Sequence, residues 1–193
     1  MSDASHEPDQ APPADRAVLQ RAFALQRPLA RAARIAHANG SGYVVFGGLS
    51  LIFAAPGLDV LGLVIGALLL VVGANARRQA AALRRAASAA PQLLARGELI
   101  LLAGLVLYGV LGLTVLPGAG DAMVKAVGNT KGLGFDVRKL GDSINTAWYA
   151  MVIGVAVLYQ GGLARYFARR RADVDSLLRE VPQWARELLP EGE

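Results

Sequence analysis

Four stretches of the chain are almost wholly apolar, and each approaches the length that a helix needs to cross a bilayer. They cover residues 40–55, 58–74, 99–116 and 144–162. A hydrocarbon core takes about 20 residues of helix, with a range of roughly 17–25. The pattern therefore predicts an all-α membrane protein with four transmembrane helices. We expect two hairpins within a domain over residues 40–163, with short amphipathic helices on the cytoplasmic side.

The first two spans are separated only by a short turn. Pro56 and Gly57 follow the first span directly, and Asp59 comes just after them. Proline followed by glycine is a strong turn signal, and the two spans together are too long for one crossing. We therefore predict a helical hairpin with Asp59 at the far interface. The first span contains Ser50 in its middle, so a re-entrant or partly interfacial segment is the alternative.

The distribution of basic residues predicts the orientation. Segment 16–39, linker 75–98 and tail 164–193 hold all but four of the 20 basic residues, and every one of theirs is arginine. The other four lie in loop 117–143. Because cytoplasmic segments carry an excess of Lys and Arg, we place both termini in the cytoplasm and loop 117–143 outside. If the first span did not cross, this asymmetry would become weaker.

The segments before and between the first spans predict surface helices. Residues 1–15 are acidic and proline-rich, which predicts a disordered tail and no signal peptide. Segment 16–39 and linker 75–98 are rich in Ala and Arg, with a bend or a division expected near Pro28 and a break at Pro91. Such basic helices usually lie on anionic headgroups, although a regulatory lipid sensor or a nucleic-acid patch has the same charge. Because no aromatic residues alternate with the arginines, we expect no nucleic-acid partner.

The C-terminal tail is the best candidate for a specific protein contact. Asp175 or Ser176 is expected to cap a helix, and Pro182 to divide the tail into two short helices. One apolar helical face follows at intervals of four, three and four residues: Leu177, Val181, Trp184 and Leu188. This face is expected to lie on the membrane or on a partner.

The loop 117–143 is too long for a passive connection. A short helix is expected over residues 121–127, and Asp142 or Ser143 is expected to cap the fourth span. The stretch 128–134 (GNTKGLG) lacks the residue order and the preceding strand of a phosphate-binding loop, so we reject that interpretation. The loop either contacts a ligand or partner outside the membrane or lies on the headgroups.

Small residues in the spans predict close helix packing. Such residues let helix backbones approach one another within a membrane. The candidates in the second, third and fourth spans are Gly62, Gly66, Gly104, Gly112, Ala150 and Gly154. Packing inside one chain is the simpler interpretation, and association of two copies is the alternative.

The chain shows little that points to catalysis. It has no cysteine, and its two histidines, His6 and His37, lie outside the spans without a companion at ligand spacing. The only acids near the spans are Asp59, at the turn, and Glu98, which we place at the start of the third span, where a carboxylate suits the helix dipole. We therefore predict no catalytic residues, no metal site and no cofactor, and a protein that is not an enzyme.

Two segments carry a resemblance to known proteins. They are the arginine-rich linker GANARRQAAALRRAASAAPQLLARGELILL and the final span with its tail, QGGLARYFARRRADVDSLLREVPQWARELL. With the glycine-rich hairpin, they resemble uncharacterised small bacterial four-span inner-membrane proteins. The resemblance implies a bacterial inner-membrane location and supplies no activity and no site residues.

Three functional hypotheses follow. The first is a non-catalytic assembly, scaffold or regulatory component that meets the lipid bilayer and either a membrane-protein partner or a second copy of itself. The second is a subunit of a small-solute transporter or channel, which four spans and a long outer loop would allow. The third is an enzyme acting at the membrane interface, with Glu98 or Asp59 as its only acids near the lipid.

Overall fold

A computed structural model describes residues 13–56, 58–114, 124–127 and 136–189. Every regular element in these residues is a helix, so the predicted all-α class is confirmed. Residues 124–127 form one short helical turn within the predicted 121–127. The other helices are α1 (Pro13–Ala54), α2 (Val60–Arg84), α3 (Ala90–Thr114), α5 (Val137–Glu180) and α6 (Gln183–Glu187).

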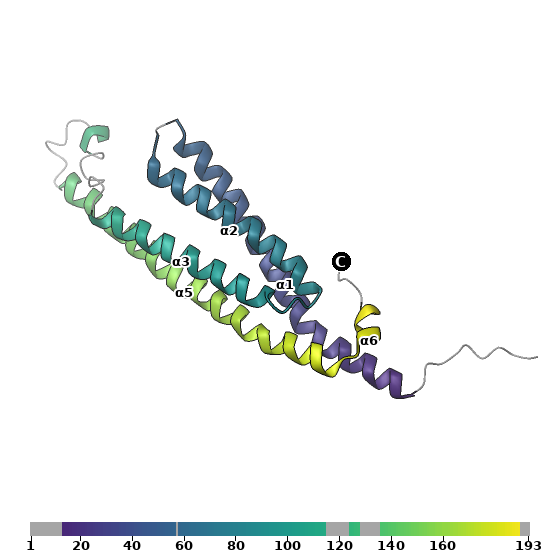
Figure 1. The fold of residues 1–193 in the computed structure, drawn as a ribbon. Helices are drawn as coiled ribbons and strands as arrows, with labels where there is room; N and C mark the ends of the chain where they lie inside the picture. The colour runs from purple at the N-terminus through teal and green to yellow at the C-terminus, as the bar shows by residue number, and fades with distance from the viewer. Residues whose placement is uncertain (1–12, 57, 115–123, 128–135, 190–193) are drawn as a thin grey trace, which may run out of the picture.

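The long helices form two antiparallel hairpins, α1 with α2 and α3 with α5 (Figure 1). The start of α1, the α2–α3 connection and α6 lie at one end of the molecule. We call it the basic end, because every arginine of the chain except Arg138 lies on the helices or turns there. The hairpins are packed together near the basic end and separate toward the α1–α2 turn, as Figure 1 shows.

Three helices, α2, α3 and α5, are long and apolar enough to cross a membrane by length and composition. The chain therefore has the character of a multi-pass membrane protein. Helix α1 does not meet the same measure. The prediction of four spans is confirmed for the second, third and fourth and not for the first. The physical reason is that the apolar part of α1 is short and contains glycines and Ser50.

Helix α1 runs unbroken through Pro28, so the alternative in which this proline divides the helix is wrong. A proline inside a helix removes a backbone hydrogen bond and costs about 3 kcal/mol. The side chains of Leu29, Ala32 and Ala33, which follow Pro28, are almost completely buried. Their packing against the rest of the core offsets this cost. Most of the predicted disordered tail falls on residues 1–12, which lie outside the described residues.

Helix α3 begins at Ala90, nine residues before the predicted third span. Pro91 lies in its first turn, where the missing N–H is not needed, so the linker ends rather than bends at this proline. Ala86 closes the preceding turn with a left-handed φ of 54°. The N–H of Ala87 donates to the carbonyl of Ala82 at 3.0 Å, which is the hydrogen bond of a Schellman cap. The early start places Glu98 two turns inside the helix.

Helix α5 begins earlier than predicted. Its N-cap is Asp136, whose side chain accepts hydrogen bonds from the backbone N–H groups of Arg138 and Lys139 at 3.1 and 3.2 Å. The expected caps Asp142 and Ser143 lie within the helix instead. The sequence offers three capping residues here, and only the first one is used.

Helix α5 also continues beyond the predicted end of the fourth span. No helix starts at Asp175 or Ser176, because α5 runs without a break to Glu180. Pro182 then occupies the N-cap position of the short α6. The tail is therefore mostly an extension of the fourth predicted span, and Val174 on this extension is completely buried.

The main apolar core lies at the basic end and joins α1, α2, α3, α5 and α6. Its largest fully buried apolar side chains are Phe167, Leu29, Leu83, Leu94 and Val174. A second, smaller cluster is formed by Tyr43, Val72 and Leu101, one layer further toward the α1–α2 turn. The shared packing of the two hairpins is therefore concentrated in the half of the molecule that holds the arginines.

Candidate functional site

Glu98 is the one carboxylic acid among the described residues whose side chain is buried in the core, with 2% of its surface exposed. The expectation that Glu98 lies at the start of the third span is therefore wrong, because α3 begins eight residues earlier and buries this side chain. Leu94, Glu98 and Leu101 follow one another at intervals of four and three and share the buried face of α3. This heptad-like spacing is visible in the sequence, and it would have placed Glu98 inside once the helix was started at Ala90.

Glu98 is held by side chains from two other helices. The hydroxyl of Tyr43, on α1, lies 2.9 Å from Glu98 Oε2 and 2.9 Å from Gln160 Oε1, on α5. Tyr43 is 8% exposed and Gln160 is 5% exposed. We call Tyr43, Glu98 and Gln160 the polar cluster. It links the first hairpin to both helices of the second.

The hydrogen bonds of the polar cluster require a proton beyond the one on tyrosine. The Tyr43 hydroxyl donates one hydrogen, and both of its contacts are to oxygen atoms. A protonated Glu98 resolves this, because the carboxyl donates to Tyr43, which donates to Gln160. The other solution is an ionised Glu98 that accepts from Tyr43, with the Gln160 amide turned so that its nitrogen donates.

A second contact ties α1 to α5 beside the cluster. The hydroxyl of Tyr159 donates to Asn39 Oδ1 at 2.9 Å, and Asn39 lies one turn before Tyr43. The Nδ2 of Asn39 is buried without a hydrogen-bond partner among the described residues. Polar side chains thus bridge the two hairpins at two successive turns of α1.

The surroundings of the polar cluster are apolar. Leu94 lies one turn before Glu98 in the main core, and Leu101 lies one turn after it in the smaller cluster. A hydrogen bond is stronger in such a medium than in water, and an unpaired charge is much more costly. A hollow of about 200 Å³, lined largely by apolar side chains of α3 and α5, reaches Gln160 from the side. The polar cluster can therefore hold a proton at Glu98 and join the two hairpins through its hydrogen bonds.

The predicted packing residues fall into two groups. A Cβ atom added to Gly66 would lie 2.8 Å from a side-chain carbon of Leu51, so this glycine marks a close contact. Gly104 and Gly112 are in similarly close contact with the side chains of Leu68 and Tyr149, and Gly62 with Ala54 and its neighbour Asp59. By contrast, Gly154 has open space around it and Ala150 is exposed. All four glycines of α2 and α3 on that list therefore pack within the chain.

The close approach of α1 and α2 involves Gly66 together with three glycines that the sequence analysis did not select: Gly40, Gly47 and Gly73. A Cβ on Gly40 would lie 2.8 Å from the carbonyl oxygen of Gly73, and one on Gly47 would lie 2.8 Å from that of Gly66. Both helices carry the glycines seven residues apart, so the two pairs lie in antiparallel register. A search for glycines with complementary spacing in consecutive spans would have found them.

The four residues of the predicted apolar tail face do not share one environment in the structure. Leu177 and Val181 are each 2% exposed and belong to the main core. Trp184 and Leu188, beyond the break at Pro182, are 43% and 63% exposed. The buried half of the predicted face packs within the chain, and only the exposed half is free to meet lipid or a partner.

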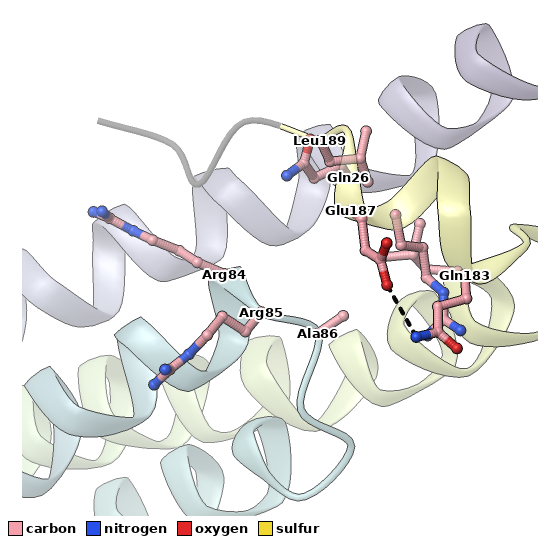
Figure 2. A pocket seen from close by; sticks show the side chains of 9 residues that line it. Gln26, Arg84, Arg85, Ala86, Gln183, Glu187 and Leu189 are labelled. Atoms are coloured by element: carbon pink, nitrogen blue, oxygen red, sulfur yellow. Dashed lines mark hydrogen bonds between the residues drawn. The ribbon is translucent and has the colours of Figure 1, made fainter.

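A cavity of about 580 Å³ lies at the basic end between α1, α6 and the end of α2 (Figure 2). Gln183 Nε2 donates to Glu187 Oε1 at 2.9 Å on one side of it. Figure 2 shows that the side chains of Arg84 and Arg85 point away from this pair. The guanidinium groups of Arg84 and Arg85 therefore do not close around the cavity, whose lining also contains Arg186.

In the described part of the chain, no three His, Cys, Asp or Glu side chains come close enough to hold a metal ion. His37 faces a groove lined by arginines, and His6 lies outside the described residues. Comparison of the chain with protein families, with curated proteins and with solved structures found no match. The inference of function therefore depends on the geometry of the chain alone.

Proposed function

We propose that this protein is a non-catalytic membrane component with an assembly or regulatory role, in which the polar cluster sets the relative position of the two hairpins. The observation that carries the proposal is the burial of Glu98 between Tyr43 and Gln160. A polar residue at a buried position of packed helices selects one register and one arrangement over others.

A regulatory role is supported by the chemistry of the cluster. An ionisable residue within a span is costly and usually functional. Whether the carboxyl of Glu98 donates or accepts depends on one proton, and this proton decides which hydrogen bonds join α1 to α3 and α5. A change in protonation would therefore change how firmly the hairpins are held together.

Removing the Tyr43 hydroxyl tests this proposal. In Tyr43→Phe, we expect the two hairpins to sample a wider range of separations, because both hydrogen bonds of the cluster are lost. The chain has no cysteine, so spin labels can be placed on single cysteines at the exposed positions Val60 and Leu113 without background. Pulsed electron–electron double resonance then measures the distribution of distances between the two labels, which lie at the tips of the hairpins.

A second label pair serves as the control. Labels at Leu113 and Ile144, both exposed and both within the α3–α5 hairpin, should give the same distance distribution in the wild type and in Tyr43→Phe. If the Val60–Leu113 distribution is also unchanged, the cluster does not set the position of the hairpins, and the proposed role fails.

We further propose that the first predicted span does cross, so that four helices pass through the bacterial inner membrane. The support is the register of the glycine pairs, which keeps residues 40–54 of α1 beside α2 along its apolar part. The clustering of arginines at the basic end supports a cytoplasmic location for that end and for both termini.

Reporter fusions test this topology. A reporter that is active only in the periplasm should give a signal when fused after Gly128 and none when fused after Glu193. Insertion of the reporter after Asp15, with the rest of the chain following it, should also give none, because four crossings return both termini to one side. A signal at Asp15 combined with none at Glu193 would instead support three crossings.

A subunit of a proton or small-solute transporter is the second candidate. Buried carboxylates in spans mark ion pathways in many transporters, and Glu98 is such a group. The rate at which liposomes containing the purified protein acidify inside would be measured. A rate above that of empty liposomes, abolished by Glu98→Gln, would favour transport. If liposomes with the protein acidify no faster than empty ones, the assembly or regulatory role is the better explanation.

A further inference from the structure

A groove of about 490 Å³ runs along the outer surface of α1 and α2 at the basic end. Its polar lining consists of His37 from α1 and of Arg77, Arg78 and Arg84 from α2, and the rest is alanine. We call it the basic groove. It is separate from the polar cluster, and nothing below depends on the role proposed for that cluster.

The spacing of residues on α2 explains the shape of the groove. Ala74, Arg77, Ala81 and Arg84 follow at intervals of three, four and three, so they lie on one face of the helix. The short alanines leave a hollow, and the long arginine side chains project beyond them. The outcome is a trough with an apolar floor and a cationic rim.

Two arginines of this rim, Arg77 and Arg78, are not neutralised by the residues that the structure describes. The side chains of Arg77 and Arg78 make no ion pair or hydrogen bond with any residue that the structure describes. By comparison, Arg170 on α5 is paired with Asp173 at 2.8 Å. The groove therefore carries positive charge that an anion would complement.

The groove continues an exposed apolar stripe of α2. Val64, Val71 and Arg78 are spaced seven residues apart, which is two helical turns or about 10 Å for each step. Both valines are more than half exposed, and α2 is long and apolar enough to span a membrane. A ligand that lies along this face would therefore contact the apolar valine side chains at one end and the guanidinium groups at the other.

We propose that the basic groove is a binding site for an anionic phospholipid, with the headgroup phosphate between Arg77, Arg78 and His37 and an acyl chain along Val64 and Val71. Guanidinium groups bind phosphate oxygens in pairs, which suits this rim. The adjoining apolar stripe favours a lipid over a soluble phosphate. An anionic headgroup is favoured over a zwitterionic one, which carries its own cation toward the arginines.

Lipid titration monitored by native mass spectrometry tests the site on the full chain in detergent. Phosphatidylglycerol should bind the wild type at least tenfold more tightly than phosphatidylcholine does. The double substitution Arg77→Gln with Arg78→Gln should weaken phosphatidylglycerol binding by about 30-fold, because each arginine near an anionic lipid surface contributes about fivefold to the affinity.

The matched control removes the same charge elsewhere at the basic end. Arg165→Gln with Arg169→Gln alters two exposed arginines of α5 and should change the affinity less than threefold. A second variant, Ala81→Leu, fills the trough without changing its charge and should also weaken binding. Ala81 is exposed, so this change leaves the core intact.

Three results would overturn the proposal. Equal loss of affinity in the two double variants would mean that diffuse charge attracts the lipid. Equal binding of phosphatidylcholine and phosphatidylglycerol would mean that the arginines do not select the headgroup. Displacement of phosphatidylglycerol by millimolar inorganic phosphate would assign the groove to a soluble anion instead of a lipid.

Discussion

Glu98→Ala is expected to lower the free energy of unfolding by about 3 kcal/mol, whereas Glu98→Gln should change it by less than about 1 kcal/mol. Alanine leaves a cavity in the core and removes a hydrogen-bond partner of the Tyr43 hydroxyl. Glutamine has the same shape, and its amide can donate to Tyr43 as a protonated carboxyl does. Unfolding of the purified protein by a denaturing detergent measures both changes.

The two substitutions also distinguish the protonation states of the cluster. If Glu98→Gln lowers the free energy of unfolding as much as Glu98→Ala does, the carboxylate is ionised and its charge is needed for stability. Glu187→Ala is the control, because this acid lies exposed on α6 with a hydrogen bond to Gln183. Its loss should change stability by less than about 0.5 kcal/mol, as expected for a surface position.

Gly47→Ala should destabilise the protein by about 1–3 kcal/mol, the range measured for overpacked cores. The added methyl group would lie 2.8 Å from the carbonyl oxygen of Gly66 and 3.0 Å from the backbone nitrogen of Leu70. Backbone atoms cannot turn aside as a flexible side chain can, so α1 and α2 would have to move apart. The same detergent unfolding experiment measures this change.

The neighbouring glycine provides a matched control. Gly48 lies on the same helix, and a Cβ there would meet nothing within 4 Å. Gly48→Ala should be neutral or stabilising by up to about 1 kcal/mol, because alanine is the better helix former. Equal effects of the two substitutions would show that the glycine contacts between α1 and α2 contribute nothing to stability.

The sequence by itself determined the features that depend on local pattern. Apolar runs predicted helices, and Pro56 with Gly57 predicted the turn that separates α1 from α2. Arginine-rich segments predicted a basic end, which the fold assembles from three separate parts of the chain. These features follow from composition over a few turns, so no contact between distant residues is needed to see them.

Helix ends were harder to predict, because they depend on packing as well as on local signals. Pro28 is a breaking signal, yet α1 continues through it because the residues that follow are buried in the main core. Asp136, Asp142 and Ser143 are all suitable caps, and the sequence does not show which one is used. The extension of α5 past residue 175 is likewise secured by contacts of Val174 and Leu177 with other helices.

Only the tertiary structure decided the environment of the polar residues. Tyr43, Glu98 and Gln160 are 55 and 62 residues apart in the chain, so their meeting depends on how the two hairpins pack. The same holds for the glycines, of which Gly66 is in close contact and Gly154 is not. A sequence shows which face a residue occupies on its own helix. Which helix lies against that face is decided by the burial of all the faces together.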